Sequence, residues 1–128
     1  RSALRSDLPA LTWSAASNRY AWASYLAHPL GRPEDRPYAV PARRWDLTGL
    51  APAWIAVGDL DLFHEEVEIY AARLQAHGVE CHLQVEPGMY HGADAAVPGA
   101  PEMQRFRADV LAALESVLAQ TPDLVEVV

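Results

Sequence analysis

Three side chains with acid–base chemistry follow two strand-like segments of the chain. Asp59 and Asp61 come at the end of an apolar run, and His91 lies in the hexapeptide PGMYHG after a second such segment. A carboxylate that accepts the N–H of an imidazole fixes the ring tautomer and stabilises the imidazolium formed during proton transfer. Histidine also changes its protonation state near neutral pH, which suits a general base. An aspartate paired with His91 would form part of a proton-transfer site.

Two predicted strands and two predicted helices would position these residues. Residues 52–60 form a continuous apolar run, typical of a strand buried on both faces. Residues 81–86 alternate apolar and polar side chains, typical of a half-exposed strand. Apolar periodicity predicts helices over 65–77 and 101–118. The resulting βαβα unit implies parallel strands, whose carboxyl ends meet at one edge of the sheet.

Two further segments precede this unit. A helix is predicted from Thr12, which can serve as its N-cap, to about Ala27. Residues 29–52 hold five prolines and two glycines and predict a long irregular connection. The last predicted helix places its apolar residues on one face. That face consists of Met103, Phe106, Val110, Leu114, Val117 and Leu118. The four tryptophans of the chain are more typical of a core than of a binding surface.

The predicted sheet is incomplete. Outside the two strand segments, the sequence offers no convincing third parallel strand, although the first strand pattern requires cover on both sides. An uncovered strand edge favours pairing with another chain. The sequence therefore predicts part of an α/β fold. We expect its partner to be the missing N-terminal part of the same fold or a second copy of this chain.

Composition excludes several classes of function. The net charge of −7 argues against non-specific nucleic-acid binding, and no apolar run reaches the roughly 20 residues of a membrane span. The first residues lack a signal-peptide pattern, which predicts a cytoplasmic location, although a true N-terminus beyond Arg1 would hide a signal. The single cysteine, Cys81, predicts a buried, inert thiol. We expect no metal and no cofactor, because the five histidines lack a His-x-x-x-His pair and a cysteine spacing.

The spacing of the acidic residues and the histidine leaves two interpretations open. An acid followed by a histidine, after two successive late strands, fits the chain order of the α/β-hydrolase triad. Alternatively, Asp59 or Asp61 caps the helix that follows, and His91 is a polar loop residue. The sequence LFHEE after Asp61 would make that aspartate a good cap.

Most of residues 11–118 resemble the C-terminal third of the hormone-sensitive-lipase-like α/β-hydrolases, a group of bacterial esterases and lipases. The resemblance rests on a Pro-Tyr-Ala-x-Pro segment, an Asp-Leu-x-Gly-Leu-Pro-Pro-like segment, a Tyr-Ala-x-x-Leu helix and a Pro-Gly-Met-x-His-Gly turn. The matching residues are Pro37, Tyr38, Ala39, Pro41, Asp46, Leu47, Gly49, Leu50, Pro52, Tyr70, Ala71, Leu74, Gly78, Pro87, Gly88, Met89, His91 and Gly92.

The resemblance implies roles for particular residues. The family's catalytic acid falls on Asp61 and its histidine on His91, while Asp59 occupies the preceding polar position and Phe63 a position at the apolar pocket. The chain departs from the family at Leu62, where a proline is usual, and at Ala93, where an aromatic residue is common. These departures leave both catalytic groups in place.

The resemblance also implies a domain assignment. Residues 1–128 would be the C-terminal segment of a single α/β-hydrolase domain. Residues 1–50 would form the helix and the irregular connection, and residues 51–128 the last two strands and helices.

The nucleophile of that family is absent from this sequence. Neither a Gly-x-Ser-x-Gly elbow nor a His-Gly-Gly loop occurs, and no serine has glycines on both sides. The serines are Ser2, Ser6, Ser14, Ser17, Ser24 and Ser116. We therefore expect the C-terminal segment of a serine carboxylesterase for small acyl esters, inactive alone. The alternative is a degenerate, non-catalytic hydrolase remnant that acts as a binding or interaction module.

Overall fold

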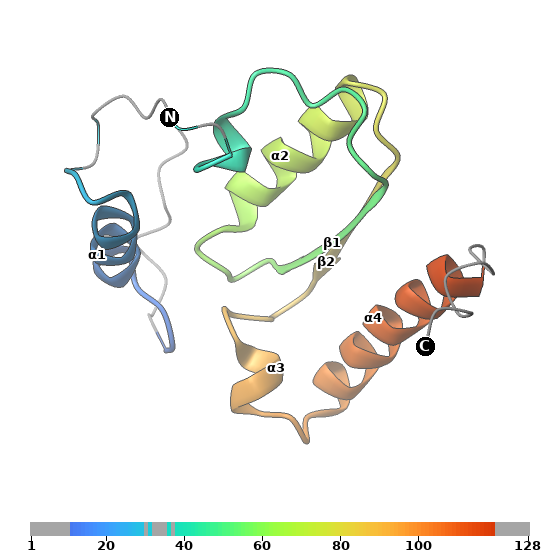
Figure 1. Ribbon diagram of the computed structural model, residues 1–128. Coiled ribbons are helices and arrows are strands. Elements are labelled where there is room, and N and C mark those ends of the chain that lie inside the picture. The colour runs from blue at the N-terminus through green and yellow to red at the C-terminus, as the bar shows by residue number, and fades with distance from the viewer. Residues whose placement is uncertain (1–10, 30, 32–35, 37, 120–128) are drawn as a thin grey trace, which may run out of the picture. The chain divides into compact units, whose positions relative to one another are not determined.

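A computed structural model describes residues 11–29, 31, 36 and 38–119 of the chain (Figure 1). The chain divides into two compact units, Arg1–His91 and Gly92–Val128, and each is described by itself. Pro37 of the family segment and the serines Ser2 and Ser6 lie outside the described residues.

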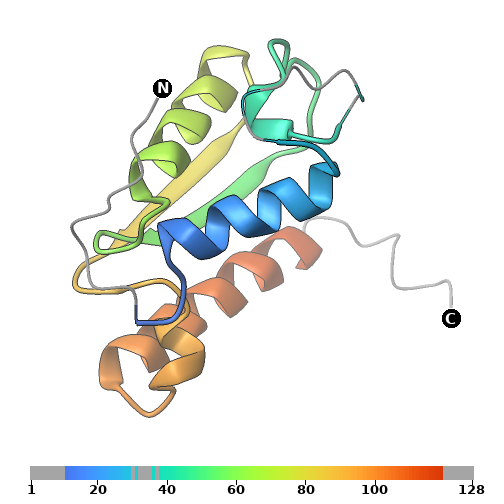
Figure 2. The same cartoon turned by 90° about the vertical axis from the view of Figure 1, so that its left-hand side faces the viewer.

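The first unit contains the predicted βαβ arrangement. Strand β1 (Ala53–Gly58) leads into helix α2 (His64–Ala76), which leads into strand β2 (Cys81–Glu86). The two strands pair in parallel, from Ala53 opposite Cys81 to Gly58 opposite Glu86. Figure 2 shows the strands side by side, with α2 packed along them. The parallel pairing and the partial α/β fold confirm the prediction, and the described residues contribute two strands to the sheet.

Burial in the sheet differs from the sequence patterns. Of the residues of β1, only Val57 and Gly58 are buried, so the expectation of a strand buried on both faces is wrong for the described part. Among the residues that the structure describes, β1 pairs with β2 alone, so its other edge has no strand neighbour there. In β2, Glu86 is buried at 9% exposure although the alternation predicts that it faces outward. Its position at the last rung of the sheet explains this, because both following turns gather there.

A small apolar core lies between α2, β2 and the irregular connection. It contains Leu47, Leu74 and Val79, and Leu47 is completely buried. Gly78 ends α2 with a left-handed φ of 77°, a conformation that glycine adopts without strain. The N–H of Val79 then bonds back to the carbonyl of Leu74 at 3.0 Å. The end of the helix and the start of β2 are therefore tied together around this core.

The irregular connection is held against α2 by polar contacts. It contains a 3₁₀ turn, η1 (Pro41–Arg43), and the guanidinium of Arg73 in α2 donates to the backbone carbonyls of Ala42 and Arg44. Asp46 accepts the N–H of Thr48 at 2.9 Å. This backbone hydrogen bond holds the pKa of the Asp46 carboxyl below its usual value. These contacts direct the adjacent leucine, residue 47, into the core.

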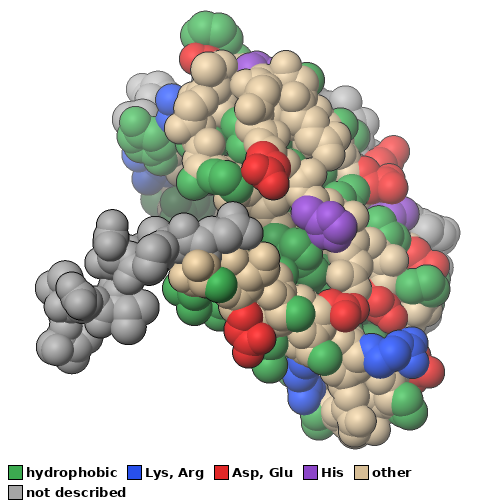
Figure 3. Space-filling view, turned by 90° about the vertical axis from the view of Figure 1, so that its right-hand side faces the viewer, with side chains coloured by type: hydrophobic (Ala, Val, Ile, Leu, Met, Phe, Trp, Pro, Cys, Tyr) green, Lys and Arg blue, Asp and Glu red, His purple; other side chains and the backbone are tan. Residues whose placement is uncertain are grey.

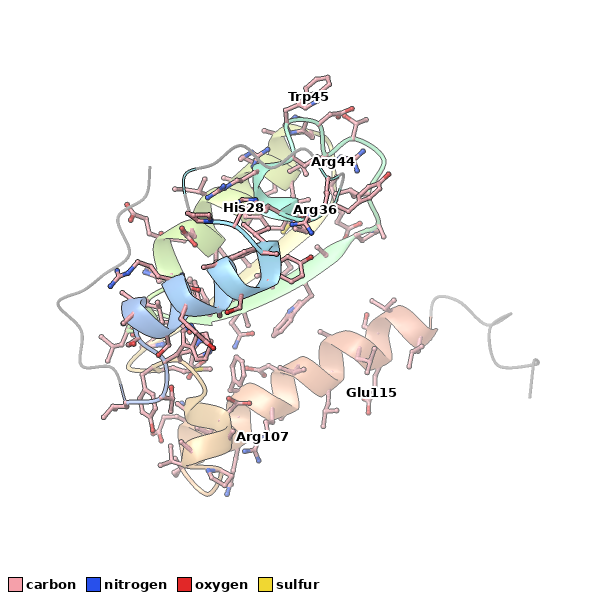
Figure 4. All side chains as sticks on the ribbon, turned by 60° about the vertical axis from the view of Figure 1, so that its left-hand side comes forward. His28, Arg36, Arg44, Trp45, Arg107 and Glu115 are labelled. Atoms are coloured by element: carbon pink, nitrogen blue, oxygen red, sulfur yellow. The ribbon has the colours of Figure 1, made fainter. Side chains whose placement is uncertain are left out.

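Trp45, in the same connection, points away from the chain (Figure 4) and is 85% exposed. The expectation that the tryptophans belong to a core is therefore wrong for this residue. Its two neighbours are held locally: the Arg44 side chain donates to the Asp46 carbonyl, and the Asp46 carboxylate accepts the Thr48 N–H.

Helix α1 (Ala15–Leu26) has its N-cap two residues later than predicted. Its N-cap is Ser14, whose hydroxyl accepts the N–H of Ser17 at 3.0 Å, so the assignment of Thr12 as the cap is wrong. Ser14 has the extended backbone of an N-cap residue, whereas the Thr12 hydroxyl bonds to the backbone of His91. At the other end, Arg36 donates to the carbonyl of Leu26 at 3.1 Å.

The second unit contains a short helix, α3 (Ala93–Ala96), and the long helix α4 (Pro101–Ala119). The sequence predicts α4 but not α3, which follows Gly92 in a left-handed conformation. Arg107 of α4 donates to the carbonyl of Asp94 and joins the two helices. No helix among the described residues is long and apolar enough to cross a membrane.

The apolar face predicted for α4 is buried only at its start. Met103 and Phe106 are buried. Apolar side chains of the later turns reach the surface between charged ones (Figure 3). These exposed residues are Val110, Leu111, Leu114, Val117 and Leu118. Beyond the second turn the predicted apolar face is therefore exposed within the described part of this unit.

Candidate active site

The carboxyl ends of β1 and β2 lie side by side, because the two parallel strands end at the same rung, Gly58 opposite Glu86. Backbone hydrogen bonds continue beyond the strands. The N–H of Asp59 donates to the carbonyl of Glu86, and the N–H of Leu60 donates to the carbonyl of Met89, both at 3.1 Å. The turn after β1 and the turn after β2 are therefore joined, and residues from both face one another.

Asp61 and His91 meet at this edge of the sheet. Oδ2 of Asp61 lies 3.0 Å from Nδ1 of His91, and the Asp61 residue is buried, with 6% of its surface exposed. Its other oxygen, Oδ1, accepts the N–H of Phe63 at 2.9 Å. An ionised carboxylate only accepts hydrogen bonds, so this contact places a proton on Nδ1. The structure brings these two residues of the predicted site together.

The alternative in which Asp59 or Asp61 caps α2 is wrong, because the N-cap of α2 is Phe63, without a side-chain cap hydrogen bond. One oxygen of Asp61 accepts the backbone N–H of Phe63, and the other faces the imidazole. Because the backbone contact holds the carboxylate plane, its second oxygen is oriented before any proton transfer occurs. Asp59 has a different partner: its Oδ1 accepts the N–H of Gly88 at 2.7 Å. Asp59 therefore binds the turn that carries the histidine and does not cap α2.

Aromatic rings surround the imidazole of His91. The Phe63 ring and the imidazole form a T-shaped pair with centroids 5.3 Å apart, and the centroid of the Trp13 ring lies at 6.3 Å. The hydroxyl of Thr12 donates to the backbone carbonyl of His91. The His91 side chain is 41% exposed, and Nε2 has no hydrogen bond within the described part of the chain. With Nδ1 protonated, Nε2 is the nitrogen that can accept a proton.

The other titratable groups do not form a metal site. No group of three or more His, Cys, Asp or Glu residues that could hold a metal ion occurs among the residues that the structure describes. The remaining histidines lie apart, each beside a local carbonyl, carboxylate or ring: His28, His64, His77 and His82. Cys81 is free and half-buried, and burial raises the pKa of its thiol, which disfavours the reactive thiolate.

The serines have structural positions. Ser14 caps α1, Ser17 and Ser24 lie within that helix, and Ser116 lies in α4. None of these four occupies a strand-to-helix turn, which a nucleophile elbow requires. Phe63 does lie beside His91, at the position that the resemblance assigns to the pocket.

Three contacts at or beside the His91 turn were not predicted from the sequence. Thr12 and Trp13 reach the histidine from 79 and 78 positions away in the sequence (91 − 12 and 91 − 13), and no local pattern indicates such a contact. Gly58 passes so close to Met89 that an added Cβ would lie 1.9 Å from its carbonyl oxygen. A glycine at the end of an apolar strand is the one signal that could have indicated this close approach.

Comparison with known proteins places the chain in a class. The sequence profile of the family described as "alpha/beta hydrolase fold" matches residues 2–95, and the chain belongs to this family. No curated protein matches the chain.

Three solved structures, two of them named as esterases, are similar to the chain. The esterase LipW from Mycobacterium marinum is 35% identical with a TM-score of 0.70, over 82% of this chain and 32% of that one. A bacterial heroin esterase is 34% identical with a TM-score of 0.72, over 84% and 34%. The protein DphMB1 is 28% identical with a TM-score of 0.74, over 87% and 36%.

These similarities confirm the resemblance to hormone-sensitive-lipase-like α/β-hydrolases and the predicted fold class. The chain spans about a third of the length of these solved proteins.

Proposed function

We propose that this chain is the C-terminal segment of a serine carboxylic-ester hydrolase and supplies the acid and the histidine of its catalytic triad. The observation that carries the proposal is the 3.0 Å contact between Asp61 Oδ2 and His91 Nδ1 at the carboxyl ends of two neighbouring parallel strands. Membership of the α/β-hydrolase family supports it, because the triad of that fold gathers at this edge of the sheet.

In this proposal His91 is the general base and Asp61 its orienting acid. Nε2 of His91 takes the proton of a serine hydroxyl as the serine oxygen attacks the ester carbonyl, and then gives that proton to the leaving alkoxide. The same nitrogen then takes a proton from water as the water oxygen attacks the acyl carbon, and gives that proton to the serine oxygen as the acyl–serine bond breaks. The Asp61 carboxylate holds the Nδ1 proton throughout, so Nε2 stays free to accept, and its charge stabilises the transient imidazolium.

The rest of the domain would supply the missing chemistry. The 128 residues contain no Gly-x-Ser-x-Gly sequence, so the nucleophile and the oxyanion-binding N–H groups would come from the other two thirds of the fold. In the described residues β1 and β2 pair only with each other, which leaves an edge of the sheet for that part. A second copy of this chain could occupy the edge but would bring no nucleophile elbow.

The substrate in this proposal is a small carboxylic ester. The support is similarity to proteins named as esterases, and the aromatic rings of Phe63 and Trp13 beside the histidine offer an apolar wall for an acyl or alcohol group. No cofactor is required, because the proton transfers use the imidazole alone. A cytoplasmic location stays a prediction from the sequence.

The first test is the intact mass and full sequence of the native gene product. We expect an α/β domain of roughly 200–250 residues or more, with a Gly-x-Ser-x-Gly sequence before Arg1, that hydrolyses p-nitrophenyl acetate and butyrate. His91→Ala should remove nearly all of this activity. His82→Ala is the matched control, because His82 is exposed on β2 and stacks on Trp54, and it should retain activity.

The alternative is a degenerate hydrolase remnant that acts as a binding or interaction module. A native product that contains no serine elbow, and that hydrolyses none of these esters, would contradict the esterase proposal and support the remnant.

A further inference from the structure

A second aspartate binds the turn that carries His91. Oδ1 of Asp59 accepts the backbone N–H of Gly88 at 2.7 Å, although the two residues are 29 positions apart. Gly88 has a left-handed φ of 72°, which glycine adopts without strain. The carboxylate therefore binds the chain three residues before the histidine, at a point where the turn bends sharply.

Backbone contacts next to the Asp59–Gly88 hydrogen bond also restrict the turn after β2. Leu60 donates to the carbonyl of Met89 at 3.1 Å, and Met89 is buried at 7% exposure. Gly58 lies so close to the Met89 carbonyl that a side chain at position 58 would collide with it. Among these contacts between the two turns, the Asp59 hydrogen bond is the one that a side chain makes, so substitution can remove it selectively.

We infer that Asp59 is a positioning residue for His91: its carboxylate fixes the turn after β2 so that Nδ1 of the histidine meets Asp61. The inference rests on the proposed function and assigns different roles to Asp59 and Asp61. Asp61 acts on the imidazole itself, through a hydrogen bond and a negative charge. Asp59 acts through the Gly88 backbone, and that role requires an acceptor oxygen but no charge.

The difference between acceptor and charge gives a sharp test. Asparagine at position 59 keeps an oxygen for the Gly88 N–H, whereas alanine removes it. In the esterase that contains this chain, we expect Asp59→Ala to lower kcat about 10-fold with KM within about 2-fold, because misplacement of a catalytic group acts on the reaction rather than on binding. Asp59→Asn should keep at least about half of the wild-type kcat, since the backbone contact is preserved.

A matched control comes from the irregular connection. Asp46 also uses Oδ1 to accept a backbone N–H, that of Thr48 at 2.9 Å, but it lies in the segment before β1. Asp46→Ala should leave kcat within about 2-fold of wild type, because the contact it loses does not hold the histidine turn.

A second readout does not depend on activity. In NMR spectra of the full-length protein, Asp59→Ala should speed hydrogen exchange of the Gly88 amide about 10-fold, since that amide loses its acceptor. The same variant should shift the ring signals of His91, and Asp59→Asn should restore both. Asp46→Ala should leave both unchanged.

The outcomes separate this inference from the proposed function. The inference is overturned if Asp59→Asn is as impaired as Asp59→Ala, or if Asp59→Ala changes neither kcat nor the His91 ring signals. A full-length protein with no esterase activity contradicts the proposed function alone, and the NMR comparison then decides on Asp59. If Asp59→Ala does not fold, Asp59→Asn decides the question. Wild-type activity of Asp59→Asn supports the acceptor role, and an about 10-fold loss of its kcat overturns the inference.

Discussion

Substitution of Asp61 by asparagine isolates the chemistry of the carboxylate from its structural role. Asparagine can keep the Oδ1 contact with the Phe63 N–H, at 2.9 Å in the wild type. Its amide group would then face Nδ1 of His91, at the position of an oxygen that lies 3.0 Å away. Because an amide NH₂ only donates, Nδ1 must become an acceptor and the imidazole proton moves to Nε2. The ring then has no free nitrogen to take the serine proton.

The expected loss is large. With the wrong tautomer and without the charge that stabilises the imidazolium, kcat should fall about 10⁴-fold, as it does when the equivalent carboxylate of a serine protease is replaced by its amide. This corresponds to about 5 kcal/mol of transition-state stabilisation. The free energy of unfolding should change much less, because the backbone contact and the side-chain volume persist.

Initial rates of p-nitrophenyl butyrate hydrolysis by the full-length protein provide the assay. Asp59→Asn is the control, since the neighbouring aspartate contacts Gly88 and not the imidazole. If Asp61→Asn retained more than about a tenth of the wild-type kcat, or if Asp59→Asn were the more damaging change, the assignment of Asp61 as the acid would be refuted. Nitrogen-15 NMR of the His91 ring gives an independent check, because it distinguishes the two tautomers directly.

Two further predictions concern the chain by itself. Leu47→Ala should lower the free energy of unfolding in urea by about 2–5 kcal/mol, because Leu47 is completely buried against Leu74 and Val79. Leu50→Ala, at a leucine that is 41% exposed, should change it by less than about 0.5 kcal/mol, and equal losses would argue against the described core. The isolated chain should also self-associate through the open edge of the β1–β2 sheet; sedimentation as a clean monomer at high concentration would contradict this.

Local sequence signals determined most of the elements. Apolar periodicity and the punctuating glycines predicted both strands, α2 and α4 within a few residues, because these signals act over one or two turns of chain. Parallel pairing followed from the order of the elements. The acid–histidine pair was also accessible from sequence, since two parallel neighbours place the residues after their carboxyl ends at one edge. Its catalytic role stays a proposal.

Only the tertiary structure decided which polar group contacts which partner. Spacing alone could not separate Asp59 from Asp61, because both follow β1 and either could cap α2. The register at Gly58 and Glu86 settles it, by directing one carboxylate to the Gly88 backbone and the other to the imidazole.

Contacts between residues that are distant in sequence also explain the remaining differences between the sequence predictions and the structure. Thr12 was expected to cap α1 but bonds to the backbone of His91, and Trp45 was expected in a core but is exposed. Each outcome depends on atoms that are distant in sequence or on a neighbouring backbone contact. Local propensity carries no information about such partners, because they become neighbours only when the chain has folded.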